Sequence, residues 1–155
     1  MKVLWMLIVL AVAVILLTGC SGTVPHCERA LTAVERAELV RIAEFVTSVG
    51  PRWEPYAAKV LVLMEVVDVP PRVCIGNAKG GLAWAQWRPL KTRILFEPEF
   101  FCGCVAQGIM WDHASVLVIE AAHIIEQSEK VHHLQREFLD DVYEAWDAQT
   151  QEASL

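Results

Sequence analysis

Basic side chains are the minority in this chain of 155 residues, which carries 13 Lys and Arg against 19 Asp and Glu for a net charge of −6. A surface that follows nucleic-acid phosphates needs the opposite sign, so we expect no nucleic-acid partner. The sequence also contains no internal repeat, no low-complexity segment, no P-loop, no dinucleotide-binding glycine motif and no nucleophile elbow. Phosphate-binding loops and serine-hydrolase chemistry therefore have no support in the sequence.

Apolar residues make up 55% of the chain, which excludes an intrinsically disordered protein. The length predicts about one domain. The part beyond residue 20 is long enough to bury a core without cross-links.

The N-terminal residues have the pattern of a secretory signal. Lys2 supplies a positive charge, and Val3 to Leu17 form an unbroken apolar run. A helix of this length spans about 22 Å, short of the roughly 30 Å hydrocarbon core of a bilayer. We therefore expect a signal sequence, with a single-pass anchor as the alternative.

The signal ends in Leu17-Thr18-Gly19-Cys20, which resembles the lipobox of bacterial lipoproteins. The resemblance implies cleavage before Cys20, with a diacylglycerol on its thiol and an acyl chain such as palmitate on its amine. These chains would anchor the protein in the cell envelope. Ser21 in place of Asp implies the outer membrane, facing the periplasm, where the host has one. An ordinary signal peptide followed by a chance cysteine is the alternative.

The expected organisation is a signal peptide over 1–19, a lipidated tether over 20–26 and one globular domain over 27–155. Four cysteines lie beyond the tether's Cys20, namely Cys27, Cys74, Cys102 and Cys104. An even number in an oxidising compartment indicates two disulfides. A bridge between Cys102 and Cys104 would be strained, so we expect Cys27 and Cys74 each to pair with one of them. A thiolate metal site and free thiols are the alternatives, although zinc sites usually show two close cysteine pairs.

Hydrophobic periodicity and turn residues predict an α+β domain with four helices beside a small antiparallel sheet of three strands. The expected helices span Cys27 to Val49, Pro55 to Val67, His113 to Ser128 and Leu134 to Gln149. The expected strands span Arg72 to Ile75, Leu82 to Arg88 and Arg93 to Glu97. Within the second strand, Trp84 and Trp87 should face opposite sides of the sheet.

The helix over His113 to Ser128 is apolar on all sides, so we expect it in the core. Glu120 and His123 interrupt it, and their spacing of three puts them on one face. A buried carboxylate and imidazole are costly unless they are paired or bind a metal. Two explanations stay open: the pair satisfies itself and nearby backbone, or it belongs to a metal or catalytic site.

Ile119-Glu120-Ala121-Ala122-His123 resembles the metal-binding helix of zincin metallopeptidases, whose motif is His-Glu-x-x-His. Arg93 to Phe100 resembles the strand that flanks the cleft in these folds, and Gln135 to Asp141 resembles the second helix of small gluzincins. The resemblance implies a zincin-like fold. It also implies four roles: Glu120 as catalytic base, His123 as zinc ligand, Glu137 as third ligand and Asp141 as the partner that orients a ligand.

The first histidine of the motif is Ile119 in this sequence. His123 and Glu137 are then two ligands, where a catalytic zinc site needs three and a water. His133, four residues before Glu137 on the same helix face, would complete a set if two helices form an antiparallel pair. Adjacent histidines in a turn, such as His132 and His133, more often lie on the solvated surface.

The leading hypothesis is therefore an envelope lipoprotein whose degenerate zincin-like domain binds a protein or peptide, without catalysis and without a cofactor. The first alternative is an active zinc peptidase with an unusual ligand set. The second is a purely structural lipoprotein, in which Glu120 and His123 only hold helices together. If the strand over Leu82 to Trp87 is a sheet edge, it could accept an extended peptide.

Overall fold

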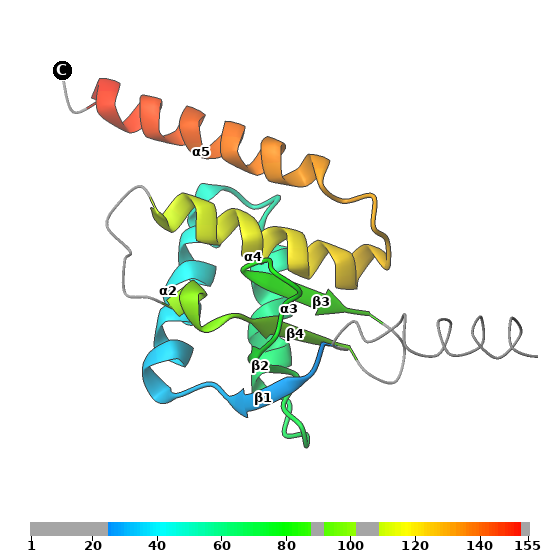
Figure 1. Cartoon of the computed structure of the whole chain (residues 1–155). Helices are drawn as coiled ribbons and strands as arrows, with labels where there is room; N and C mark the ends of the chain where they lie inside the picture. Colours follow the sequence, from blue (N-terminus) through cyan, green and yellow to red (C-terminus); the bar gives the residue numbers. More distant parts are fainter. Residues whose placement is uncertain (1–24, 88–91, 102–108, 153–155) are drawn as a thin grey trace, which may run out of the picture.

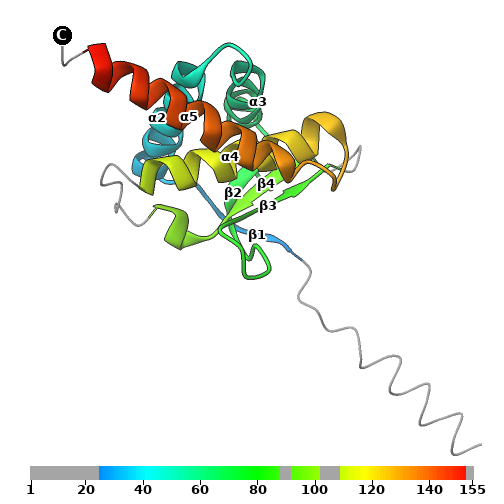
Figure 2. The same cartoon turned by 90° about the horizontal axis from the view of Figure 1, so that it is seen from above.

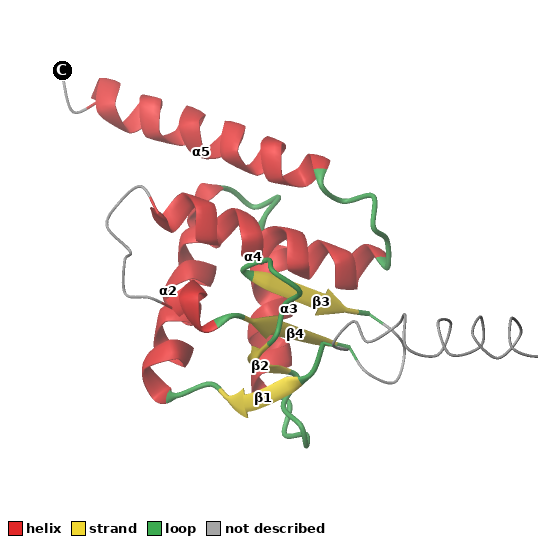
Figure 3. Cartoon of the chain, viewed as in Figure 1, coloured by secondary structure: helices red, strands yellow, loops and turns green. Residues whose placement is uncertain are grey.

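The computed structural model describes residues 25–87, 92–101 and 109–152 (Figure 1). Along the chain the elements are β1 (Cys27–Ala30), α2 (Ala33–Val49), α3 (Glu54–Glu65), β2 (Val73–Gly76), β3 (Ala83–Gln86), β4 (Arg93–Phe96), the 3-10 turn η1 (Pro98–Phe101), α4 (Ile109–Glu126) and α5 (His133–Glu152). The predicted α+β class with four main helices is confirmed (Figure 3).

The first element is a strand, where the periodicity predicted the start of a helix. Cys27–Ala30 pairs with β2, and α2 begins only at Ala33. The Thr32 hydroxyl accepts a hydrogen bond from the Glu35 N–H, and the Glu35 carboxylate accepts one from the Thr32 N–H at 2.7 Å. This capping box marks a helix N-terminus, so the residues before it are available to pair with the sheet.

The described sheet has four strands in the order β1-β2-β4-β3, so the predicted antiparallel sheet of three strands is wrong. β2 is antiparallel to β1 and parallel to β4, and β3 forms the far edge antiparallel to β4. All four residues of β2 are buried, as is typical of a strand with neighbours on both sides. β3 alternates between buried and half-buried residues, which is the pattern of an edge strand with one face toward solvent.

Helix α4 lies at the centre of the domain, between the sheet and α5 (Figures 1 and 3). It packs against α2, α3, α5 and β3. Seen from above, α5 crosses over α4 (Figure 2). Partners on so many sides explain why α4 is apolar around most of its circumference. Its fully buried residues include Leu117, Val118, Ala121 and Ala122.

Cys27 of β1 and Cys74 of β2 form a disulfide, with Cα atoms 5.8 Å apart. The prediction that each would pair with Cys102 or Cys104 is therefore wrong. Sequence spacing did not show that β1 and β2 are neighbours, and their pairing brings the two cysteines within bridging distance. Cys102 and Cys104 lie outside the described residues.

No helix within the described ranges is long and apolar enough to cross a bilayer. The predicted signal peptide, the lipobox and the lipidated Cys20 lie outside the described residues.

Candidate metal site

Two polar side chains interrupt the apolar helix α4. His123 is buried, with 6% of its surface exposed, and Glu120, one turn earlier, is mostly buried. Ile119, at the position of the first histidine of the zincin motif, is 7% exposed and belongs to the hydrophobic core. A metal site in this region must therefore take its further ligands from outside the motif.

The Glu120 carboxylate lies beside the edge strand β3 and accepts a hydrogen bond from the backbone N–H of Ala85. The pKa of this carboxyl is raised from 4.5 to about 7, mainly by burial and also by the Glu129 carboxylate. His123 and the Ala85 N–H lower the pKa, because both favour the charged form. Glu120 therefore exchanges its proton near neutral pH, as a general base or acid must.

His123 is held in one orientation by two neighbours. Its Nδ1 lies 2.7 Å from the carbonyl oxygen of Ser128, and because a carbonyl can only accept, Nδ1 carries a proton. The ring stacks on the indole of Trp87, with centroids 5.3 Å apart and planes at 9°. In the neutral ring Nε2 then keeps the lone pair that a metal ion needs.

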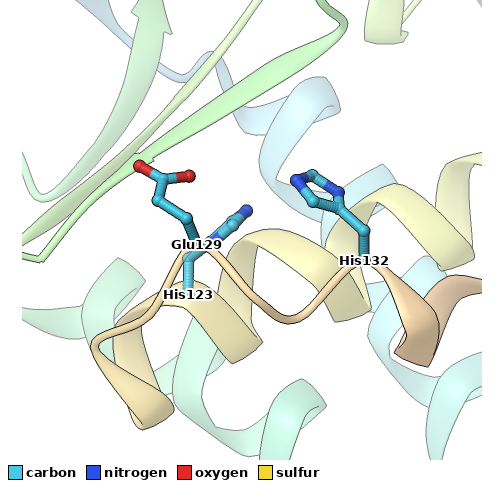
Figure 4. A group of neighbouring side chains, drawn as sticks. All are labelled: His123, Glu129 and His132. Carbon is cyan, nitrogen blue, oxygen red and sulfur yellow. The ribbon is translucent and has the colours of Figure 1, made fainter.

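The turn between α4 and α5 brings two more ligating side chains to His123 (Figure 4). Gln127 ends α4 in a left-handed conformation, with φ at 49°. The ring of His132 meets that of His123 edge to face, with centroids 5.3 Å apart. One ligand atom from each of His123, Glu129 and His132 lies within 4.8 Å of the other two. Figure 4 shows the three side chains pointing to the same side of the turn.

These three side chains fit the ligand preferences of zinc. Two imidazoles and one carboxylate, completed by a water, form a known catalytic ligand set. Ligand atoms around a tetrahedral zinc ion lie about 3.4 Å apart, because each bond is roughly 2.0–2.2 Å long. Glu129 and His132 are exposed, so rotation of their side chains can close a gap of up to 4.8 Å while the buried His123 stays in place.

The structure places the other predicted site residues elsewhere. Glu137 forms an ion pair with Arg52. Asp141 accepts a hydrogen bond from the buried indole N–H of Trp53 at 2.8 Å. His133 is exposed, and its Nδ1 lies 3.1 Å from a carbonyl oxygen of the same turn. The face of α5 that carries Glu137 and Asp141 therefore meets the residues just before α3, and neither side chain belongs to the group around His123.

Glu129 and His132 are not among the ligands predicted from the sequence. His132 was expected on the solvated surface. Its side chain is indeed exposed, and its ring also contacts that of His123. The sequence did contain a signal for these two ligands. Glu129 and His132, which are both metal-ligating residue types, lie in a short turn directly after a helix with His123 near its end.

A groove of about 350 Å³ opens beside the candidate site. It is lined by Pro25, Lys79, Trp84, Ala85, Gln86, Trp87 and Glu129. Trp84 and Trp87 both line this groove. Trp87 also stacks on His123 of α4, whereas Lys79 lies over the ring of Trp84. That the two indoles face opposite sides of the sheet stays a prediction.

Comparisons of the chain with protein-family models, with curated proteins and with solved structures gave no match.

Proposed function

We propose that this protein is a lipid-anchored protein of the bacterial cell envelope whose zincin-like domain binds one divalent metal ion, preferentially zinc. The observation that carries the proposal is the meeting of His123, Glu129 and His132, whose ligand atoms lie within 4.8 Å of one another. The lipobox resemblance at Leu17 to Cys20 supports the anchor. The disulfide between Cys27 and Cys74 is in keeping with an oxidising compartment.

A metallopeptidase is the activity that best fits this site. A bound zinc ion supplies a Lewis acid and a water of lowered pKa. Glu120 is the group placed to take a proton, and Ser128 and Trp87 keep His123 oriented. The antiparallel edge strand β3 lies against α4, where it could hold an extended peptide.

A protein- or peptide-binding domain without catalysis is the second candidate, and two observations favour it. Ile119 packs into the core in place of a ligand. His123 has a hydrogen-bond partner in Ser128 and a stacking partner in Trp87 without any ion. In this case the groove beside β3 would hold the partner.

Metal content tests the site. After dialysis against zinc, a chain that begins at Ser21 should retain about one zinc ion. His132→Ala and Glu129→Gln should lose it, because each removes one ligand. His133→Ala is the matched control, since His133 is adjacent and exposed but lies outside the ligand group. A wild-type chain without zinc, or equal loss in His132→Ala and His133→Ala, would contradict the site.

Glu120→Gln separates the two candidates. A peptidase should lose hydrolysis of an unfolded protein such as casein in this variant while it keeps its zinc, because Glu120 acts as a base and not as a ligand. A zinc-loaded wild-type protein that cleaves no peptide bond would favour the binding domain.

Mass spectrometry of the mature N-terminal peptide tests the anchor. We expect Cys20 as the first residue, with added acyl mass on both its thiol and its amine. An unmodified Cys20, or an N-terminus at another residue, would contradict lipid anchoring.

A further inference from the structure

We propose that one surface of the domain, formed by Pro25, Lys79, Trp84, Gln86 and Trp87 and called here the tryptophan face, lies on the lipid headgroups of the membrane that holds the anchor. The proposal rests on the lipid anchor of the proposed function. It deepens that function, because it sets the candidate metal site at the membrane surface.

The length of the tether is the first argument. Pro25 lines the groove of the tryptophan face, and it is only five residues beyond Cys20. Even a fully extended chain of this length covers at most about 18 Å. A domain of this size has a radius of gyration of about 14 Å, so acyl chains on Cys20 favour contact through the side on which Pro25 lies.

The chemistry of the face is the second argument. Trp84 and Trp87 are half-buried, so each presents part of an indole to the outside. Indoles have an apolar body and a polar N–H, and they collect at the interface between hydrocarbon and water. The face therefore carries the aromatic side chains that suit the headgroup region.

A cation accompanies the indoles. Lys79 is exposed, and its Nζ lies 5.6 Å from the centroid of the Trp84 ring. Its backbone N–H donates to the Asn77 side chain at 2.8 Å, which holds the turn that presents it. An ammonium group beside an interfacial indole is placed to reach a lipid phosphate.

Within the described ranges, the tryptophan and tyrosine side chains that are exposed rather than half-buried lie on a different part of the molecule. Tyr143 and Trp146 are 56% and 49% exposed, and both belong to α5. Figure 1 shows α5 on the far side of α4 from the sheet that contains β3. Trp146 is therefore a control for Trp84 within the same chain.

The position of the groove has a consequence for the candidate site. Glu129 lines the same groove as Trp84 and Trp87, so the metal site and the tryptophan face are continuous. With the face on the headgroups, the peptides that reach this site are membrane-proximal segments of envelope proteins.

Tryptophan fluorescence in vesicles tests the proposal. The full-length protein, lipidated by the expressing bacterium, is reconstituted in phosphatidylcholine with or without bromine on the acyl chains. Bromine quenches indoles that lie at the bilayer, so the emission of the wild-type protein should fall in the brominated lipid. About half of this loss should disappear in Trp84→Phe, because one of the two indoles of the face is removed, whereas Trp146→Phe should keep all of it.

Hydrogen exchange of the anchored wild-type protein tests the same orientation without a substitution. Amides of residues 77–87 should exchange more slowly on vesicles than in detergent solution, and amides of α5 should not change. Quenching that is unchanged in Trp84→Phe but reduced in Trp146→Phe, or protection of α5 alone, would overturn the proposal.

The outcomes also separate this proposal from the proposed function. An anchored protein without bromine quenching overturns the membrane-facing orientation alone. An unmodified Cys20 overturns both the anchor and the orientation, while zinc binding, measured in solution, is decided independently.

Discussion

At the scale of the residue, Glu120 links the stability of the fold to pH. Burial of this α4 side chain beside β3 raises the pKa of its carboxyl from 4.5 to about 7. Between pH 4.5 and about pH 7, the folded chain therefore binds more protons than the unfolded chain. The free energy of unfolding must fall as the pH rises through this window, because the folded state holds an ionised Glu120 less well than water does.

Glu120→Gln should remove this dependence. The stability of the variant relative to the wild type should increase by roughly 2–3 kcal/mol from pH 5 to pH 8, since each pKa unit corresponds to about 1.4 kcal/mol. Urea unfolding at both pH values, with a chelator present, measures the difference. Glu144→Gln, an exposed position on α5, is the control and should follow the wild type. Parallel pH curves for Glu120→Gln and the wild type would rule out the raised pKa.

At the scale of the element, α5 is attached to the residues just before α3 by polar contacts. Asp141 accepts from the indole N–H of Trp53, which is fully buried, and Glu137 pairs with Arg52. The Phe138 ring adds a T-shaped apolar contact, with its centroid 5.2 Å from that of Trp53. These contacts give Glu137 and Asp141 a structural role distinct from the one that the zincin resemblance implies.

Asp141→Ala should destabilise the fold by about 1–3 kcal/mol, because it leaves the buried Trp53 N–H without an acceptor. Its zinc content should match the wild type, since Asp141 lies outside the ligand group. Asp140→Ala, at the neighbouring exposed position, should leave both the stability and the zinc content unchanged. Thermal unfolding and metal analysis of the same samples give both readouts. Loss of zinc with unchanged stability would instead support the zincin role of Asp141.

At the scale of the whole molecule, the disulfide ties the N-terminal strand to the centre of the sheet. Cys27 and Cys74 are separated by 47 positions. Closing a loop of this length stabilises a fold by about 4 kcal/mol in the chain-entropy model, and measured values are usually 2–4 kcal/mol. The proposed anchor at Cys20 precedes β1, so under the proposed function the same bond would connect the membrane tether to the core.

Replacing both Cys27 and Cys74 by alanine should therefore lower the free energy of unfolding by about 2–4 kcal/mol. Peptide mapping without reduction should recover a peptide containing Cys27 linked to one containing Cys74. A linkage from either cysteine to the peptide that contains Cys102 and Cys104 would restore the pairing expected from the sequence.

Local patterns predicted much of this architecture. The four helices follow from apolar residues at helical spacing, and three of the four strands follow from short apolar runs between turn residues. Glu120 and His123 stood out for a local reason, because they are polar residues inside an apolar helix. Long-range pairing was not predictable in this way. β2 pairs with β4 in parallel and with β1 in antiparallel orientation. These pairings join residues far apart in the sequence, so no local pattern predicts them.

The sequence by itself determined the α+β class, the helices and the polar pair on α4, since each depends on neighbours within a few turns of chain. The tertiary structure decided which side chains meet that pair. The left-handed Gln127 turns the chain back over α4, and this reversal places Glu129 and His132 beside His123. α5, on the other side of the turn, carries Glu137 toward Arg52 instead. A ligand set is a matter of distances in space, and the backbone path of one turn settles those distances.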